Sequence, residues 1–316
     1  MTLASELISY RKPDGFILST GNLYFTYHDD ATASVWRAAQ SAVPGQEILL
    51  YSEPGAQFGD IVFAEVDGTW WGYFFSGNAG ATTTIKRVPL TGGAATVLAT
   101  ITDVDVANSH RNLVTDGMNL YWQDVSSVRM MPIGGGAVTV LDQASPNTPT
   151  AGLALQNGNL IYASVADIRY VPTSGATSPP SDRTIVTASE RVTTLHAVLS
   201  FVYWGDDSGT IGVVLISDPS SQGPIVSNGG GVPTSISTSV HGGVYAQAWT
   251  LCGSESCRLH IDVPSGEYSD YDIDGDALGV SIATSGDVFW GDDSGVHRYT
   301  PRTYGEPIAR DVIRRA

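Results

Sequence analysis

The sequence predicts an all-β fold, a seven-bladed β-propeller with four antiparallel strands per blade. Its 316 residues include 35 glycines, 16 prolines and 14 tyrosines, and only 15% are charged. This composition is typical of short strands joined by tight turns. No periodic run of Ala, Leu, Glu and Lys indicates a long helix. A paired aromatic or apolar strand also recurs every 41 to 51 residues, close to the repeat length of propellers.

The recurring strand marks the predicted second strand of each unit. The markers are Tyr24, Trp70, Tyr121, Tyr162, Tyr203, Tyr245 and Phe289. The units span approximately 14–53, 55–101, 108–143, 147–189, 191–230, 232–273 and 275–310 of a single domain, 1–316. Packing the units radially hides each sheet between two neighbours, so the marker aromatics are expected between blades.

The third unit shows how four strands fit into one repeat. Its strands are expected over Asn112–Thr115, Leu120–Asp124, Ser127–Pro132 and Ala137–Leu141, with glycine-rich turns between them. The sequence does not decide which terminus closes the ring. Either residues 1–10 or the segment Glu306–Asp311 supplies the strand that completes the last blade.

The charge of the chain limits the classes of partner that it binds. The formal net charge is −16, which argues against nucleic acids and anionic membranes, because both bind through Lys and Arg. A cationic partner or a metal ion fits the acidic field, although acidity also serves solubility alone. No apolar run reaches the roughly 20 residues of a membrane helix.

Two cysteines indicate the compartment. Cys252 and Cys257 flank a Gly-Ser-Glu-Ser loop between two alternating segments, which predicts a hairpin. The two side chains would face each other at a separation that a disulfide spans, and a disulfide implies a secreted, periplasmic or cell-surface protein. A pair of reduced thiols is the alternative. Residues 1–13 lack the features of a signal peptide, so either the protein is cytosolic or an export signal was removed.

The second strands resemble a known repeat. Tyr121-Trp-Gln-Asp124 and Tyr203-Trp-Gly-Asp206 are similar to the YWTD repeat of low-density-lipoprotein-receptor propellers, and Phe289-Trp-Gly-Asp292 is a variant. The resemblance implies a propeller and a structural role for the repeat's Asp, which bridges blades. This chain differs from the receptor propellers in having seven units where they have six, and Tyr27 stands where the motif has Asp. The resemblance therefore does not predict that this chain binds ligands as the receptor propellers do.

Acidic pairs follow several second strands and form the first candidate site. Asp206, Asp207, Asp292 and Asp293 occupy equivalent places in two units, and His28-Asp-Asp30 follows a third second strand. Loops at equivalent places converge on one end of a propeller, where a ring of carboxylates binds Ca²⁺. The alternative is that the first Asp bridges blades and the second caps a turn.

A second candidate site resembles the start of a calcium loop. In the run 270–276, Asp270, Asp272 and Asp274 occupy positions one, three and five, and Gly275 occupies position six. Position twelve is Ser281, where a calcium loop has Glu. An Asp-rich connection without metal is the alternative.

Histidines, an arginine and tryptophans complete the candidates. His28, His110 and His196 are catalytic candidates at the channel rim, as acid, base or metal ligands. Arg111 and Trp249 are candidate ligand-binding residues. Trp249, Trp36 and Trp71 are candidates for stacking on a sugar. Incidental histidines and a tryptophan packed on the disulfide are the alternatives.

Three classes of function follow from these candidates. The first is a binding propeller that presents the loop face at the channel mouth to a protein, glycan or small molecule. The second is a metal-dependent hydrolase or lyase at that mouth. The third is a structural module. No Gly-x-Ser-x-Gly elbow, phosphate-binding loop or His-Glu-x-x-His helix occurs in the sequence, which favours the binding class.

Overall fold

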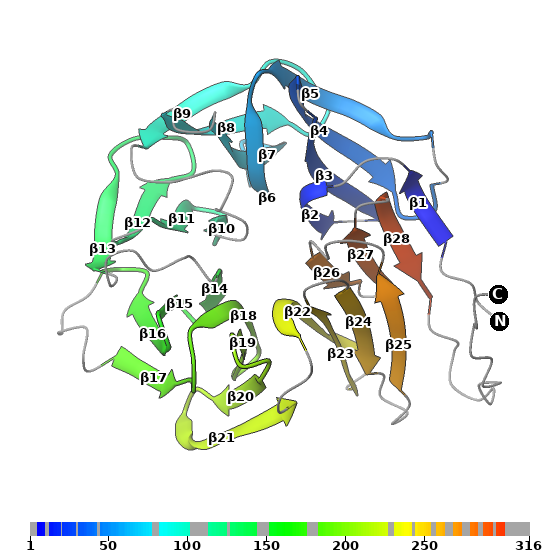
Figure 1. The fold of residues 1–316 in the computed structure, drawn as a ribbon. Coiled ribbons are helices and arrows are strands. Elements are labelled where there is room, and N and C mark those ends of the chain that lie inside the picture. Colours follow the sequence, from blue (N-terminus) through cyan, green and yellow to red (C-terminus); the bar gives the residue numbers. More distant parts are fainter. Residues whose placement is uncertain are drawn as a thin grey trace, which may run out of the picture.

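The structure is a computed structural model. It describes residues 5–9, 13–19, 21–29, 31–42, 45–77, 82–101, 113–124, 127–143, 152–175, 183–226, 231–241, 244–253, 257–262, 268–273, 279–283, 287–292 and 295–300. Their strands form seven sheets, each of four antiparallel strands arranged around a ring (Figure 1). The predicted seven-bladed propeller is therefore confirmed. No helix within these ranges has the length and apolar character needed to cross a membrane.

The blades are numbered here from the first complete sheet of the chain. Blade 1 has β2 (Pro13–Ser19), β3 (Asn22–His28), β4 (Thr32–Ala39) and β5 (Ile48–Pro54). Blade 2 has β6 (Gln57–Val66), β7 (Thr69–Gly77), β8 (Thr83–Pro89) and β9 (Thr96–Ile101). Blade 3 has β10 (Leu113–Thr115), β11 (Asn119–Gln123), β12 (Ser127–Pro132) and β13 (Thr139–Gln143). Blade 4 has β14 (Leu153–Gln156), β15 (Asn159–Ser164), β16 (Asp167–Pro172) and β17 (Thr184–Thr187).

The remaining blades follow the same order. Blade 5 has β18 (Val192–Val198), β19 (Phe201–Asp206), β20 (Ile211–Leu215) and β21 (Asp218–Val226). Blade 6 has β22 (Val232–His241), β23 (Val244–Cys252), β24 (Cys257–Asp262) and β25 (Tyr268–Ile273). Blade 7 has β26 (Gly279–Ile282), β27 (Val288–Asp292), β28 (Gly295–Tyr299) and the N-terminal strand β1 (Ser5–Ser9).

The N-terminal strand closes the ring. β1 pairs antiparallel with β28, with Ser5 opposite Arg298 and Ser9 opposite Gly295. It is the outermost strand of blade 7, and the first strand of every blade lies nearest the centre of the ring (Figure 1). Among the described residues, it is therefore the N-terminal segment that completes the last blade, a point that the sequence leaves open.

Glycine-containing turns set the hairpins between first and second strands. In blade 2, Asp67 and Gly68 have φ values of 51° and 75°. In blade 4, Asn157 and Gly158 have φ values of 50° and 73°. Two successive residues with positive φ produce the tight turn whose twist matches that of paired strands. Asp-Gly and Asn-Gly are the sequences that adopt this turn at the lowest cost.

Paired side chains on the second strands seal the blade interfaces. The first member of each pair faces the following blade and the second faces the preceding blade, because successive residues of a strand point to opposite faces. Seven buried clusters among the described residues each join the first member of one blade to the second member of the next. The pairs are Tyr24–Phe25, Tyr73–Phe74, Tyr121–Trp122, Ile161–Tyr162, Tyr203–Trp204, Ala248–Trp249 and Phe289–Trp290.

Two of the predicted marker positions differ from the buried pairs. In blade 2 the marker Trp70 is 46% exposed at the start of β7, and the pair lies further along the strand at Tyr73–Phe74. In blade 6 the marker Tyr245 precedes the pair Ala248–Trp249 in the same strand. Both strands have nine residues, so they extend past the hairpin and move the pair away from the turn.

The outer strands of blades 1 to 4 share a β-bulge. One extra residue in each strand has no partner opposite it, and these residues are Leu50, Leu98, Leu141 and Ile185. Leu50, Leu141 and Ile185 are buried, and Leu98 is half-buried. A bulge re-aims one side chain and increases the local twist. Here it turns an aliphatic side chain from the outer edge into the interface between blades.

Buried ionic groups connect neighbouring blades. Asp142 of blade 3 accepts a hydrogen bond of 2.6 Å from the Tyr162 hydroxyl of blade 4 and one of 3.0 Å from Arg183 Nη2. All three residues are buried. Glu53 of blade 1 pairs with Lys86 Nζ of blade 2 and accepts a hydrogen bond from Ser76. Paired charges of this kind are tolerated in an interior, whereas single ones are very costly.

Candidate functional site

The ends of the blades form two faces of the ring. The face called here the loop face carries the loops between second and third strands and the connections between blades. The opposite face, called the hairpin face, carries the turns between first and second and between third and fourth strands. This division follows from the antiparallel order of every blade. Among the described candidates, His28, Asp206 and Asp207 lie at the loop face.

Asp206 organises the loop face of blade 5. Its buried carboxylate accepts hydrogen bonds from the Ser208 amide at 3.0 Å, the Ser208 hydroxyl at 2.5 Å and the Thr210 amide at 3.3 Å. It also accepts a bond of 2.8 Å from the Ser189 hydroxyl, in the connection from blade 4. One carboxylate therefore ties the loop after β19 to the connection between two blades.

Asp207 and Arg191 form an outward-facing pair beside Asp206. The Arg191 Nε and Nη2 atoms lie 2.7 and 2.9 Å from the two carboxylate oxygens of Asp207. The two side chains are 41% and 35% exposed. Bidentate geometry of this kind fixes the orientation of both groups. Asp207 thus presents a paired carboxylate to solvent, at a fixed position on the loop face.

Asp124 has the same place in blade 3 as Asp206 in blade 5. Its carboxylate accepts hydrogen bonds from the Ser127 amide at 2.7 Å and the Ser127 hydroxyl at 2.9 Å, and it pairs with Arg129. The side chain is buried. Both Asp residues therefore shape their own loops by accepting hydrogen bonds from within the chain.

The other predicted metal ligands are only partly described. Asp292 ends β27, and its side chain, like the residues Asp293 and Asp274, lies outside the described part. Asp270 and Asp272 are exposed in β25 and face partners on β24. Asp270 lies 2.7 Å from His260 Nδ1, and Asp272 lies 3.9 Å from Arg258 Nε. The first half of the predicted calcium loop is therefore strand.

No group of three or more His, Cys, Asp or Glu side chains suited to a metal ion occurs among the residues that the structure describes. The carboxylate ring and the calcium loop remain predictions, because several of their members fall outside that part of the chain.

The two histidine candidates that the structure describes lie in different blades. His28 ends β3 in blade 1 and is half-buried. His196 lies in the inner strand of blade 5, opposite Tyr203, which packs in the interface with blade 6. Its Nε2 atom is buried without a hydrogen-bond partner, and burial lowers its pKa to about 4. The imidazole is therefore neutral at pH 7. His110, like the ligand-binding candidate Arg111, lies outside the described residues.

Trp249 is buried in the interface between blades 5 and 6. Only 4% of its surface is exposed, and its indole stacks on the His260 ring with centroids 4.3 Å apart. Blade 7 repeats the arrangement, since Trp290 stacks on His297 at 5.2 Å. In blade 5 the corresponding third-strand residue is Gly212, where an added Cβ would lie 2.2 Å from a ring atom of Trp204. A buried indole on a polar or small neighbour is thus a repeated packing device.

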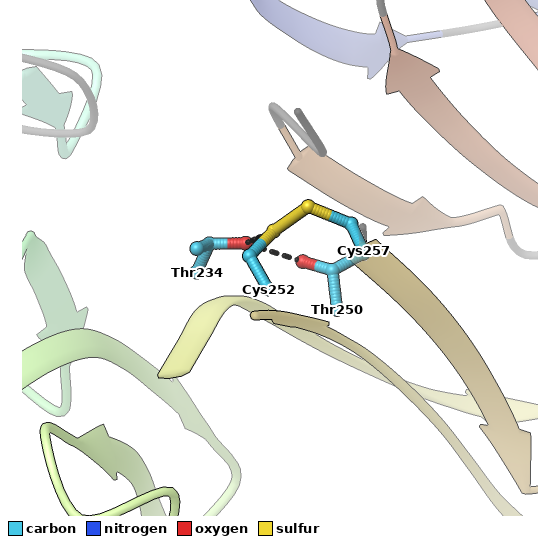
Figure 2. The surroundings of a disulfide bond; sticks show 4 residues. All are labelled: Thr234, Thr250, Cys252 and Cys257. Carbon is cyan, nitrogen blue, oxygen red and sulfur yellow. Dashed lines mark hydrogen bonds between the residues drawn. A yellow bond between two sulfur atoms is a disulfide. The ribbon is translucent and has the colours of Figure 1, made fainter. Parts of the chain in front are cut away.

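The predicted disulfide is confirmed. Cys252 and Cys257 are opposite residues of β23 and β24, and their sulfurs are bonded at 2.01 Å. Figure 2 shows Thr234 beside this bridge, with its hydroxyl 2.8 Å from that of Thr250 and 3.7 Å from Cys252 Sγ. The disulfide therefore fastens the loop-face end of the β23–β24 hairpin in blade 6.

Sequence reasoning missed the partners of the acidic residues. Arg191 and Ser189, which hold Asp207 and Asp206, were not among the candidates. An arginine directly before a first strand, in the blade that contains an Asp-Asp pair, is a signal that could have identified the ion pair. The arrangement around Asp206 offers a preorganised polar surface, since its loop positions are fixed by hydrogen bonds.

Comparison with known proteins identifies the fold. No protein-family model and no curated protein sequence matches the chain, so the resemblance to the YWTD repeat is not confirmed. Among solved structures, streptogramin B lyase is similar with a TM-score of 0.67 and 13% identity over 94% of this chain and 96% of that one. The WD40 β-propeller domain of Doa1 is similar with a TM-score of 0.61 and 12% identity over 96% and 98%. Saccharomyces cerevisiae Sqt1 gives a TM-score of 0.61 and 12% identity over 96% and 87%.

Proposed function

We propose that this protein is a binding propeller that presents its loop face, at the mouth of the central channel, to a partner protein. The observation that carries the proposal is the Asp206 network. It fixes the loop at 207–210 and the connection at 188–191 in one arrangement. Binding surfaces that are ordered before contact lose less conformational entropy on association. The propeller folds of the WD40 proteins are compatible with this class of function.

The chemistry of the described loop face supports a polar interface. Asp29, Glu190 and the Asp207–Arg191 pair are charged side chains on the described loops of this face. Charged groups at the rim of an interface steer association and select partners. The acidic excess of the chain favours a partner with a complementary basic surface. The disulfide supports a secreted, periplasmic or surface location.

Site-specific photocrosslinking tests the proposal directly, because it captures a partner of any identity. A benzophenone amino acid replaces Glu190, which is exposed on the loop face. The matched control replaces Met118, which is 74% exposed in the turn before β11 on the hairpin face. Irradiation in the source cells or their secreted fraction should give a discrete adduct from position 190 only. Equal adducts from both positions, or an adduct from position 118 alone, would contradict the proposal.

The calcium prediction for the run 270–276 keeps a test of its own. Thermal unfolding is measured after exhaustive EDTA treatment, and again with Ca²⁺ and then Zn²⁺ added back. A metal that binds only the folded state raises the melting temperature by mass action. A saturable rise with Ca²⁺ that Asp274→Asn abolishes supports the ion site. An unchanged melting temperature contradicts the ion site and leaves the binding proposal standing.

A further inference from the structure

The turn between β15 and β16 places an aliphatic side chain on the loop face. Ser164 and Asp167 are paired across the two strands, so Val165 and Ala166 form a two-residue turn. Val165 is 45% exposed, and among the described residues it belongs to neither of the buried clusters that flank blade 4. Its side chain therefore adds little to the packing between blades.

Val165 has a backbone conformation that suits glycine or asparagine better than valine. Its φ is 60°, whereas Ala166 does not have a positive φ. A two-residue hairpin turn with positive φ at its first position alone favours glycine there, and a β-branched residue in this region is strained. Elsewhere in blade 4 the chain has a suitable residue, since Asn157 has a φ of 50° in the turn before β15. Valine at position 165 therefore lowers the stability of the fold.

The turn itself is held by backbone contacts that need no particular side chain. The Val165 carbonyl accepts a hydrogen bond of 2.9 Å from the Val192 amide, and the Ala166 carbonyl accepts one of 2.9 Å from the Ala188 amide. Glycine or asparagine at position 165 would make the same contacts with less strain. Since strained residues cluster at binding and catalytic sites, the valine side chain is best explained by a contact outside the chain.

The same backbone contacts bring Val165 beside the Asp206 network. Residues 188–192, on which both hydrogen bonds end, connect blade 4 to blade 5, its neighbour in the ring (Figure 1). Within this connection, Ser189 donates a hydrogen bond of 2.8 Å to Asp206. The exposed aliphatic side chain therefore adjoins the polar surface that the proposed function assigns to the partner.

Glu190 gives this part of the loop face an acidic rim. It is exposed in the same connection, and no ion pair of the described residues includes it. Arg169 and Arg191 are each already paired with an aspartate at 2.7 Å. An aliphatic group beside such a carboxylate complements an apolar recess in a basic surface. A second copy of the chain, with its net charge of −16, would instead bring like charges together.

We infer that Val165 is the apolar contact residue of the loop face, and that it fits an apolar recess in the basic surface of the partner protein. The inference rests on the proposed function, because it names the part of the loop face that the partner touches. Protein interfaces have an apolar centre and a polar rim. The exposed residues Thr187, Ser189 and Glu190 supply such a rim here.

The test compares two variants that remove an exposed aliphatic side chain from the same kind of turn. Val165→Asn changes the loop face. Leu199→Asn is the matched control on the hairpin face, where Leu199 has a φ of 53° and is 53% exposed between β18 and β19. Asparagine adopts positive φ more readily than either residue, so neither variant should have a lower melting temperature than the parent. Val165→Ile keeps the apolar contact and is the conservative variant.

Binding is measured as the yield of the photoadduct from benzophenone at position 190. The parent and all variants carry this group, so the lost carboxylate is common to them. In Val165→Asn the yield should fall roughly tenfold, because the burial of one aliphatic side chain against the partner is lost. In Leu199→Asn and Val165→Ile the yield should stay within about twofold of the parent's.

The outcomes separate this inference from the proposed function. An adduct that Val165→Asn leaves unchanged would retain the binding propeller and overturn the role of Val165. A melting temperature of Val165→Asn clearly below the parent's would show that the valine serves the fold, and would overturn that role as well. An adduct with the mass of two copies of the chain would overturn the inference by identifying a second copy as the partner. The absence of any adduct in the parent would contradict the proposed function, and this inference with it.

Discussion

Replacing Asp142 with leucine should be among the most damaging single changes to the interface between blades 3 and 4. The carboxylate accepts hydrogen bonds from the Tyr162 hydroxyl and Arg183 Nη2 at 2.6 and 3.0 Å. Arg183 is 3% exposed, and its Nε and Nη1 atoms already have no hydrogen-bond partner. Asp142→Leu would leave a buried guanidinium without its counter-charge. Removing one member of a buried ion pair costs about 3–5 kcal/mol.

Removing both charges together should reverse most of this loss. In Asp142→Leu/Arg183→Met the buried charge is absent, and apolar side chains of similar volume fill the space. Such replacements are often neutral or stabilising, so we expect the free energy of unfolding of the double variant to lie within about 2 kcal/mol of the parent's. The remaining loss comes from the Tyr162 hydroxyl, which no longer has an acceptor. The exposed pair on the loop face is the matched control, and Asp207→Asn should cost less than about 1 kcal/mol.

Guanidinium chloride unfolding followed by tryptophan fluorescence measures these free energies, provided that the m-values of the variants agree. A free energy of unfolding for Asp142→Leu within about 1 kcal/mol of the parent's would contradict the buried ion pair. A double variant whose loss of stability equals the sum of the two single losses would contradict it as well, since the two residues would then not act as a pair.

Three further predictions concern packing, the disulfide and pH. Gly212→Ala should lower the free energy of unfolding by about 1–3 kcal/mol, because the new Cβ overlaps the Trp204 indole. Gly223→Ala in the same blade is the control in the same unfolding assay, because its Cβ meets no atom within 4 Å. Cys252→Ser/Cys257→Ser should cost about 2 kcal/mol, and dithiothreitol should destabilise the parent but not this variant. Burial opposes ionisation of Glu53, but Lys86, Ser76 and Tyr51 outweigh it, so the pKa of Glu53 lies below its ordinary value. The ionised Glu53 therefore stabilises the fold at pH 7, and this stabilisation is lost as the pH falls through the lowered pKa. The difference in melting temperature between the parent and Glu53→Gln should accordingly shrink in acid. A difference that stays constant with pH would contradict this.

Much of the fold could be predicted because the packing between blades repeats in the sequence. A pair of buried side chains such as Tyr121–Trp122 or Tyr203–Trp204 lies between the sheets in every blade, and each pair contains at least one aromatic residue, so the pairs recur at the blade period. The prediction of their position failed in blade 2, because Trp70 and Trp71 give the stronger local signal there. Trp70 is exposed, and Arg87 covers the ring of Trp71 at 4.3 Å.

The candidate site was less accessible to sequence reasoning. The Asp-Asp pairs identify the loop face, but their role depends on residues from other strands, such as Ser189 for Asp206 and Arg191 for Asp207. Such contacts depend on the angle between blades, which no local pattern records. The same holds for Asp142 and Arg183, which lie 41 positions apart in the chain. The bulge at Leu98 was missed for a related reason, because a single extra residue does not change the apolar character of a strand.

The pairing of β1 with β28 has a consequence for the order in which the protein is made. Ser5 leaves the ribosome long before its partner Arg298 is synthesised. Blades 1 to 6 are each contiguous in sequence and are able to form as they emerge, since domains and their parts begin folding during synthesis. Blade 7 has to wait, while the N-terminal strand remains unpaired. Closing so long a loop is slow compared with local hairpin formation, so the ring is completed in a late step that joins the oldest of these strands to the youngest.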